Sequence, residues 1–310
     1  MIKGWIIGFY LVLAICRPSL AQQEPTFSHY SFNPISINPA FAGKEECLSM
    51  IAINRARWLN FPGSPRTQLF SVHSIVKTDR IGIGGTFMND TKGPYHGTGL
   101  DLDIAYRLPL GNGRLSIGLM GGLRFISTRL QSEVVTVEQG DVAFQSDILM
   151  QALPNFGFGL LYSLNDFYVG FSLPRSLKNK INQQLVDGNS FEERNYYFMT
   201  GTAFNLKKDE SIKLKPSLFW KITGSTLLQV DATVLFSFKE KFWVGPMYRS
   251  TNDFGLLTGI HLNSQLQFGY AFDWSLGNKT VQYNNGTHEF MLRYDFVFEE
   301  KQGIVSPRHF

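Results

Sequence analysis

Histidine is the side chain of this sequence best suited to acid–base chemistry, and it occurs six times. A hydrolase with a serine nucleophile needs a histidine beside the serine and an acidic or amide group beside the histidine. The histidines are scattered along the chain, and the sequence places none of them beside a serine. We therefore predict loop, lumen or interface histidines and no catalytic site. They are His29, His73, His96, His261, His288 and His309.

Two further patterns could bind ligands, and each has a simpler structural interpretation. Asp101 and Asp103 share one strand face, but a metal site needs a closer cluster of ligands. We expect these carboxylates to pair with Arg in a polar interior. GNGRLSIG (residues 111–118) lacks the Lys and the helix of a phosphate loop, and its Asn-Gly pair is typical of a hairpin turn. The sequence thus predicts neither a metal nor a cofactor.

The composition favours an all-β membrane protein over a nucleic-acid-binding protein. Of 310 residues, 14% are aromatic and only 17% are charged, whereas an average soluble domain has about 25% charged residues. The whole chain carries 29 basic and 25 acidic residues, and Lys3 and Arg17 belong to the leader. The remaining 27 basic residues nearly balance the acidic ones, so a nucleic-acid partner has no electrostatic support.

The first 21 residues are predicted to be a cleaved signal peptide. Lys3 precedes an apolar run from Gly4 to Cys16, and Ser19–Ala21 offers a cleavage site before Gln22. The alternative is an N-terminal anchor, but the run is shorter than the roughly 17–25 residues that span a bilayer. After cleavage Cys47 is the one cysteine left. It cannot form an internal disulfide, and we expect a passive strand residue.

Alternation with a period of two residues is the main structural signal. In HEFMLRYDFVF (residues 288–298), one face is apolar and the other carries Glu289, Arg293 and Asp295. Successive side chains of a strand point to opposite faces, so each such run predicts a strand with one apolar and one polar face. The same alternation occurs at residues 100–108, 228–236 and 266–274.

A soluble β-sandwich also alternates, but three features favour a transmembrane barrel. The runs are close to the 9–11 residues that cross a bilayer at a tilt. Aromatic residues such as Trp220, Trp274 and Phe298 gather at strand ends, where interfacial girdles lie. Small and charged residues share the second face, as in a polar lumen. The predicted fold is therefore an all-β, antiparallel transmembrane β-barrel over residues 47–298.

Counting the alternating runs between turn signals gives about fourteen strands, an even number as in bacterial barrels. They are expected at 47–54, 66–77, 81–89, 98–108, 114–126, 155–163, 167–173, 195–206, 212–222, 226–237, 242–250, 254–262, 265–274 and 288–298. Every second connection is short. The others include the long segments 55–65, 127–154, 174–194 and 275–287, although two, near 223–225 and 251–253, are short. Because barrels have short periplasmic turns and longer extracellular loops, we place the long segments outside the cell.

Residues 22–46 lie outside the strand pattern, and their prolines exclude a central strand. Two Asn-Pro pairs, at 33–34 and 38–39, impose a defined path, since Asn favours turns and Pro fixes φ. Two interpretations remain open: a plug or brace for the barrel, and a docking surface for a periplasmic partner. Residues 299–310 form a short charged tail.

The same N-terminal segment carries a resemblance to a known family. HYSFNPISINPAFAG (residues 29–43) resembles the opening signature of the PorP/SprF outer-membrane proteins. NRARWLNFPGSPRT (54–67), IGIGGTFMNDTKG (81–93), PNFGFGLLY, YVGFSLP, GPMYRS, FGYAFDW and THEFMLRYDF follow in the family's order. The set spans essentially the whole mature chain. One departure is Arg57, where the family has Gln.

The resemblance implies a role in type IX secretion and gliding motility of Bacteroidetes. Members of this family help to export large adhesins and to hold them at the surface through an adhesin C-terminal domain. They also associate with periplasmic or lipoprotein components of the machinery, and with outer-membrane lipid around the barrel. Carried onto this sequence, the resemblance implies partner-binding residues at Tyr30, Asn33, Pro34, Asn38, Pro39, Arg55, Trp58, Asn89 and Asp90.

Two other functions remain as alternatives. The first is an outer-membrane porin or transporter for a small solute, which would require an open lumen. The second is a barrel lipase, which would require one serine whose replacement abolishes esterase activity and leaves the barrel intact. The segment from Lys178 to Arg194 holds charges of both signs, as a solvated outer loop does. Two interpretations of this loop stay open: it simply stays in water, or it contacts the adhesin.

Overall fold

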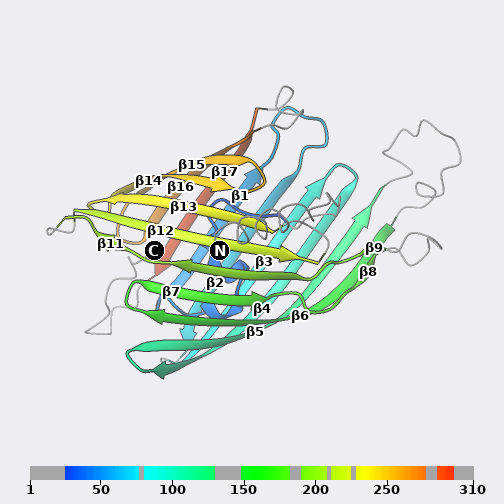
Figure 1. Cartoon of the computed structure of the whole chain (residues 1–310). Helices are drawn as coiled ribbons and strands as arrows, with labels where there is room; N and C mark the ends of the chain where they lie inside the picture. Colours follow the sequence, from blue (N-terminus) through cyan, green and yellow to red (C-terminus); the bar gives the residue numbers. More distant parts are fainter. Residues whose placement is uncertain are drawn as a thin grey trace, which may run out of the picture.

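The computed structural model describes residues 25–76, 80–129, 148–181, 190–207, 211–224, 228–276 and 285–296. They form a closed antiparallel barrel of 14 strands around an N-terminal segment (Figure 1). The predicted fold class is confirmed. The expected signal peptide (1–21) and tail (299–310) lie outside the described residues, as does most of the expected turn at 78–80.

Each barrel strand pairs with the next barrel strand along the chain, as β10 does with β12, and one further pairing, of β1 with β17, closes the ring. The short β11 (Phe204–Asn205) pairs with the start of β12, and β8 (Lys180–Ile181) pairs with β9 (Ser190–Phe191) outside the barrel sheet. The barrel strands are β1 (Leu48–Ala56), β2 (Arg66–Val76), β3 (Ile81–Lys92), β4 (Tyr95–Leu110), β5 (Gly113–Thr128), β6 (Ile148–Leu164), β7 (Phe167–Leu173), β10 (Asn195–Gly201), β12 (Ile212–Thr223), β13 (Gln229–Phe238), β14 (Phe242–Arg249), β15 (Asp253–His261), β16 (Leu266–Ser275) and β17 (Thr287–Phe296).

The apolar face of each strand points outward. On β4, the side chains of Leu100, Leu102 and Ile104 are 51%, 62% and 51% exposed, whereas Asp103 and Arg107 are each 6% exposed. A protein in water would bury the opposite face, because exposed apolar surface costs free energy. A bilayer reverses this preference, and the outward band is the surface that faces lipid.

The two ends of the barrel differ, and we name them by their connections. The loop end is the end at which β1 finishes, at Ala56, and the turn end is the end at which β1 begins. At the turn end, two residues join β4 to β5 and two join β6 to β7. The first of these turns contains Gly111 at φ +59°, a conformation that costs glycine little.

Two predicted strands differ from the structure by more than three residues at one end. β6 begins at Ile148, inside the expected loop 127–154, and it runs through Pro154. Its extra length pairs with the far end of β5, as far as Thr128, so a long hairpin replaces part of that loop. β10 ends at Gly201, and the predicted strand 195–206 continues only as the separate β11.

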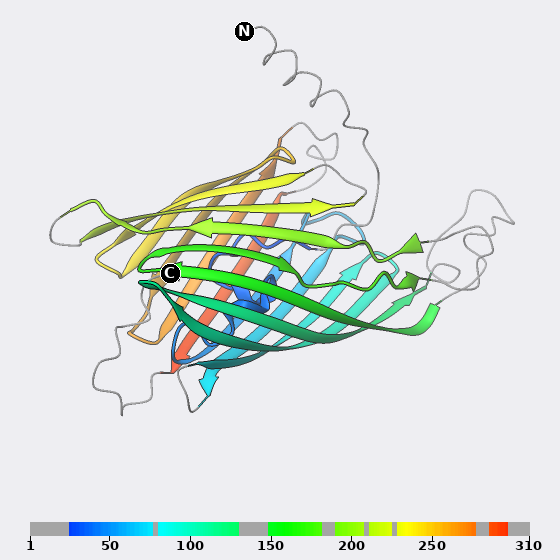
Figure 2. The same ribbon diagram turned by 60° about the horizontal axis from the view of Figure 1, so that its bottom comes forward.

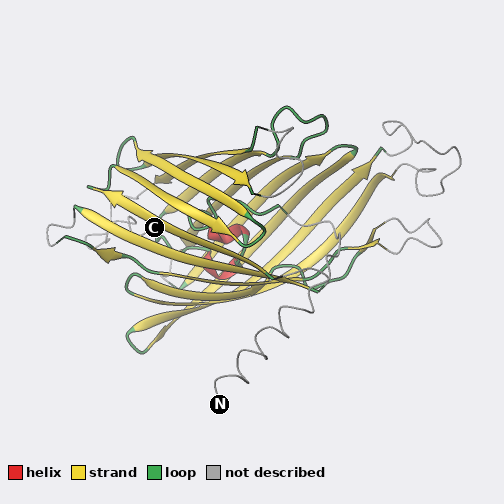
Figure 3. Ribbon diagram, turned by 45° about the horizontal axis from the view of Figure 1, so that its top comes forward, coloured by secondary structure: helices red, strands yellow, loops and turns green. Residues whose placement is uncertain are grey.

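The N-terminal segment lies inside the ring of strands, as two views of the barrel show (Figures 2 and 3). It contains two short 3-10 helices, η1 (Pro34–Ser36) and η2 (Pro39–Phe41). We call residues 25–46 the lumen segment. Its apolar side chains and those of the inner barrel wall form one buried cluster. Among the described residues, no helix is long and apolar enough to cross a membrane.

Candidate functional site

The lumen segment runs from the loop end of the barrel to the turn end. Near its start, the backbone N–H groups of Ser28 and His29 donate hydrogen bonds to Glu289, close to the loop end of β17. Near its finish, Glu46 pairs with Arg107 and Arg114, which lie at the turn ends of β4 and β5. The segment thus traverses most of the lumen before it enters β1.

The two Asn-Pro pairs set the path of this segment. Pro34 and Pro39 each open a 3-10 helix, where the fixed φ of proline suits the first helical position. The side chain of Asn38 accepts a hydrogen bond from the N–H of Ala40 and donates to the carbonyl of Leu160 at 3.0 Å. Asn33 donates to Ser71 Oγ at 3.0 Å. Asn38 therefore caps its turn and ties it to the barrel wall, whereas the Asn33 side chain makes the tie to the wall without a cap.

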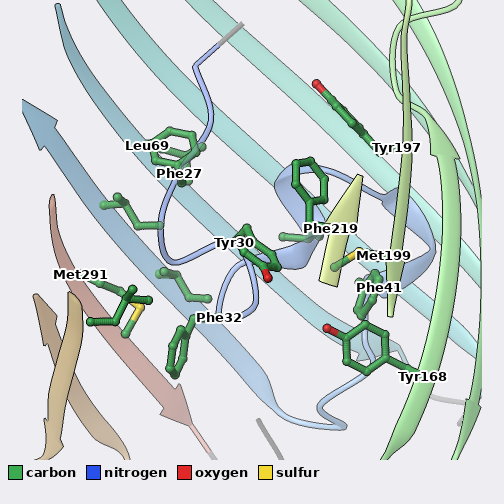
Figure 4. Close-up of a cluster of buried hydrophobic side chains, with 14 of the residues drawn as sticks. Phe27, Tyr30, Phe32, Phe41, Leu69, Tyr168, Tyr197, Met199, Phe219 and Met291 are labelled. Atoms are coloured by element: carbon green, nitrogen blue, oxygen red, sulfur yellow. The ribbon is translucent and has the colours of Figure 1, made fainter. Parts of the chain in front are cut away.

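Aromatic side chains fill the space between the lumen segment and the wall. Tyr30 packs on Phe219, with ring centroids 5.3 Å apart, and Phe41 packs edge-on against Tyr168 at 5.7 Å (Figure 4). The Tyr30 hydroxyl is 3.0 Å from Ser217 Oγ and donates to Thr233 Oγ1 at 3.2 Å. Burial raises the pKa of Tyr30 to about 12, so the hydroxyl stays protonated and able to donate.

A buried ionic cluster holds the start of the segment. Arg55 pairs with Glu289 at 2.6 Å and with Asp273 at 2.8 Å. His29 Nδ1 lies 2.7 Å from Glu289 Oε1, and the Ser28 hydroxyl donates to Asp273 at 2.7 Å. All five side chains are at least 97% buried. A charge buried in this way is costly unless it is paired. Here Arg55 and the two carboxylates of the wall neutralise one another, and Ser28 and His29 of the segment complete their hydrogen bonds.

A second ionic cluster lies nearer the turn end. Arg293 pairs with Asp295 at 2.9 Å, donates to the Phe32 carbonyl at 3.2 Å and lies 3.8 Å from Glu45. Burial raises the pKa of Glu45, but His73 and Arg293 outweigh this effect and hold the pKa below its usual value. Glu45 therefore stays ionised and fastens the end of the lumen segment to the wall.

Two glycines of the wall allow the backbone of the segment to come close. A Cβ on Gly82 would overlap the carbonyl of Ala42, and a Cβ on Gly118 would overlap the backbone of Pro39 and Ala40. Both glycines face inward on strands that otherwise carry side chains into the lumen. The fit between segment and wall is therefore made by backbone contact as well as by side chains.

A cavity of about 60 Å³ remains beyond the lumen segment, toward the loop end. Its lining combines apolar side chains with Arg124 and Arg175, which each lie 3.1 Å from Glu192. Asn155 and Asn179 also donate to this carboxylate. Glu192 thus ties the segment between β7 and β10 to the wall. We call this cavity the vestibule; its lining includes Phe27, Ser36, Met88, Arg124, Arg175 and Tyr197.

The structure divides the predicted partner-binding residues into two groups. Tyr30, Asn33, Pro34, Asn38, Pro39 and Arg55 are buried together in the lumen. The other three lie toward the loop end: Trp58 is half-buried in the connection after β1, at φ +53°, Asn89 faces outward, and Asp90 faces inward and accepts from Thr67 at 2.7 Å. A direct role of either group in partner binding stays a prediction.

Apart from Arg55, the acidic and basic residues that hold the lumen segment were not among the predicted site residues. The sequence does mark Glu289, Asp273 and Arg293, because each of them lies on the charged face of an alternating run. Glu192 lies in the charged segment from Lys178 to Arg194, where the sequence indicated an outer loop and no contact with the wall. Among the described residues, no three His, Cys, Asp or Glu side chains are grouped to hold a metal ion.

Comparison with known proteins relates the sequence to one family. A family model described as type IX secretion system membrane protein PorP/SprF matches residues 19–294. No curated protein matches the chain.

Solved structures resemble the fold at low sequence identity. CymD, a monoaromatic hydrocarbon channel, aligns with a TM-score of 0.52 and 10% identity, over 86% of this chain and 92% of its own. The outer membrane protein Omp33 of Acinetobacter baumannii aligns with a TM-score of 0.47 and 9% identity, over 82% of this chain and 100% of its own. At such identity the likeness to CymD concerns the outer-membrane barrel fold alone.

Proposed function

Because the chain belongs to the PorP/SprF family of type IX secretion system membrane proteins, we propose that it holds a large secreted adhesin at the cell surface by binding the adhesin's C-terminal domain. The protein is an outer-membrane barrel of that secretion system. Adhesin binding, cleavage of a signal peptide and a part in gliding motility are parts of this proposal. We also propose that the barrel binds its partner without catalysing a reaction.

The filled lumen is the observation that carries this proposal. A porin conducts through a water-filled channel, whereas here the lumen segment occupies the barrel. Buried hydrogen bonds to Glu289 hold its start, and the Arg293–Glu45 ion pair holds its finish. Opening such a channel would break the hydrogen bonds that join Glu289 and Arg55 to Ser28 and His29. This arrangement favours binding at the ends of the barrel over conduction through it.

The vestibule is the place at the loop end best suited to the adhesin. It combines the apolar surfaces of Phe27 and Met88 with the guanidinium groups of Arg124 and Arg175. Interfaces are commonly centred on such buried aromatic and arginine side chains. At the turn end, we expect periplasmic or lipoprotein components of the machinery to bind, near Glu46 and the short turns.

The test is a pull-down of the tagged native protein from gently solubilised outer membranes, followed by mass spectrometry. We expect one large surface protein in near-equal amount. Met88→Trp, which fills the vestibule from β3, should reduce its recovery about tenfold or more. Phe87→Trp is the matched control, because Phe87 is the neighbouring residue on β3 and faces lipid, and it should leave recovery unchanged.

Two results would contradict the proposal. Recovery of the barrel alone, together with solute-dependent conductance in planar bilayers, would leave the porin alternative. If Met88→Trp and the wild type recovered equal amounts of the adhesin, the vestibule would not be the binding site. The other loops at the loop end would then be tested.

A further inference from the structure

The outer surface of the barrel carries a groove over the seam between the first and last strands. Its volume is about 460 Å³, and its lining is almost entirely apolar. It lies on the face that points away from the lumen, over β1, β2 and β17, with β3 and β16 at its edges. We call it the β1 groove; its outward-facing lining residues are Ala52, Phe70, Phe87, Phe268, Phe290 and Leu292.

The pairing register explains why the surface is hollow at this place. Ala52 lies directly opposite Phe70 on one side and Leu292 on the other. Phe87 and Phe268 extend the same row outward on each side. A methyl group therefore stands in the middle of a row of large side chains. Phe70 and Leu292 are 44% and 47% exposed, and they form the two walls of the groove.

The end of the groove nearest the barrel's loop end is polar on its β2 side, whereas Phe290 lies opposite Asn54 on its β17 side. One register step from Ala52, Asn54 faces Gln68, and Gln68 in turn faces Asn89. The next step pairs Ala56 with Arg66. Arg66 is exposed, and no ion pair links it to an acidic residue of the described part of the chain. Two amides and a cation thus stand where the apolar groove meets the membrane surface.

The groove and the exposed Arg66 beyond it fit within one leaflet. The four-residue step from Ala52 to Ala56, which pairs with Arg66, spans about 13 Å along a strand. A strand tilt of about 40° reduces this to about 10 Å along the membrane normal, less than the roughly 15 Å of half a hydrocarbon core. A chain that begins beside Arg66 therefore reaches the level of Ala52 within the same leaflet.

We propose that the β1 groove binds one phosphate-bearing lipid of the leaflet at the loop end. Its acyl chain lies between Phe70 and Leu292, and its phosphate lies beside Arg66 and the Asn54 and Gln68 amides. Guanidinium and amide groups donate hydrogen bonds to phosphate oxygens, and a snug apolar channel gains dispersion contacts with an acyl chain. This site is separate from the vestibule and from the lumen segment.

Native mass spectrometry of the detergent-solubilised full chain tests the proposal, with two added lipids. Dipalmitoyl phosphatidylglycerol carries the phosphate, and dipalmitoylglycerol has the same acyl chains without it. Ala52→Phe should weaken binding of both lipids about fivefold or more, because the ring occupies the space of the acyl chain. Arg66→Gln should weaken binding of phosphatidylglycerol by about tenfold and leave dipalmitoylglycerol unchanged.

Each variant has a matched control elsewhere on the barrel. Gly121→Phe adds an outward aromatic ring on β5, where no neighbour lies within 4 Å, and it should leave lipid binding unchanged. Arg80→Gln removes an exposed cation at the turn end and should also have no effect. Ala52→Leu repeats the test with a smaller side chain if the phenylalanine variant does not fold.

Three outcomes would overturn the proposal. Binding that is insensitive to Ala52→Phe and Ala52→Leu would show that the groove holds no acyl chain. An equal loss with Arg66→Gln and Arg80→Gln would show a general charge effect. A dimer of the wild type that Ala52→Phe abolishes, with no lipid retained, would assign the groove to a second copy of the chain.

Discussion

Replacing Glu289 with alanine should release the start of the lumen segment while the barrel stays folded. This carboxylate accepts hydrogen bonds from the backbone N–H groups of Ser28 and His29 at 2.9 and 2.8 Å, and it pairs with Arg55 at 2.6 Å. Glu289 lies on β17, within the ladder between β1 and β16. Its side chain contributes to docking of the segment, whereas its backbone holds the strands together.

The size of the effect follows from burial. Glu289 and Ser28 are fully buried and Arg55 is 2% exposed, so the variant leaves an arginine with only Asp273 to balance it. Breaking a buried pair in this way costs about 3–5 kcal/mol. At 1.4 kcal/mol for each factor of ten, the population of the released segment should rise roughly a hundredfold to several thousandfold.

Limited proteolysis with chymotrypsin measures this population directly. The sites at Tyr30, Phe32 and Phe41 are at most 5% exposed in the docked segment, so cleavage requires release. When opening is fast relative to cleavage, the cleavage rate follows the open population. We expect fragments that begin after these aromatic residues to appear much faster in Glu289→Ala, with unchanged strand content by circular dichroism.

The control is Glu240→Ala at the turn end. Glu240 pairs with Lys213 at 2.9 Å, and its side chain is 26% exposed. A partly solvated pair of this kind is worth about 1 kcal/mol or less, so cleavage should change by less than about fivefold. If Glu289→Ala behaved like this control, the ionic cluster would not hold the segment, and the aromatic packing around it would have to do so alone.

Three further predictions concern the lumen segment and the barrel wall, and urea unfolding in detergent followed by tryptophan fluorescence checks each of them. Gly118→Ala should destabilise the protein by about 1–3 kcal/mol, because the methyl group meets the segment's backbone, whereas Gly121→Ala, with open space around it, should not. Tyr30→Phe should cost about 1 kcal/mol through its lost hydroxyl contacts. Asp231→Leu should cost about 3 kcal/mol, because it removes the nearest partner of the buried Arg249, whose hydrogen bond Asp231 accepts at 2.9 Å, and leaves only Asp253 and Asp273 at 3.8 and 3.9 Å. Adding Arg249→Met should recover much of that loss; an additive double variant would contradict this.

Much of the barrel could be predicted from alternation alone. The runs at 100–108 and 288–298 assigned the apolar face and the charged face correctly, because a strand has only two faces and the bilayer accepts only one of them. The length of β6 could not be predicted in this way. Residues 148–154 form a strand because the far half of β5 pairs with them. The sequence of residues 148–154 does not show how far that partner strand extends.

The candidate site was predictable only in part. The Asn-Pro pairs identify a segment with a fixed path, since proline and asparagine restrict the backbone locally. The sequence left open whether this path lay in the lumen or on a docking surface. Tyr30 and Asn38 lie in the segment that the sequence identifies. Their neighbours in the sequence do not indicate that Ser217 and Leu160 are their hydrogen-bond partners.

By itself, the sequence determined the strands, the outward apolar face and the stiff N-terminal segment, because each depends on neighbours within a few residues. Only the tertiary structure decided that this segment fills the lumen. Ser28 and Asp273 are 245 residues apart along the chain, and His29 and Glu289 are 260 apart. Their contact exists because β17 pairs with β1 to complete the ring. The resulting low-dielectric interior then makes each buried charge depend on its partner.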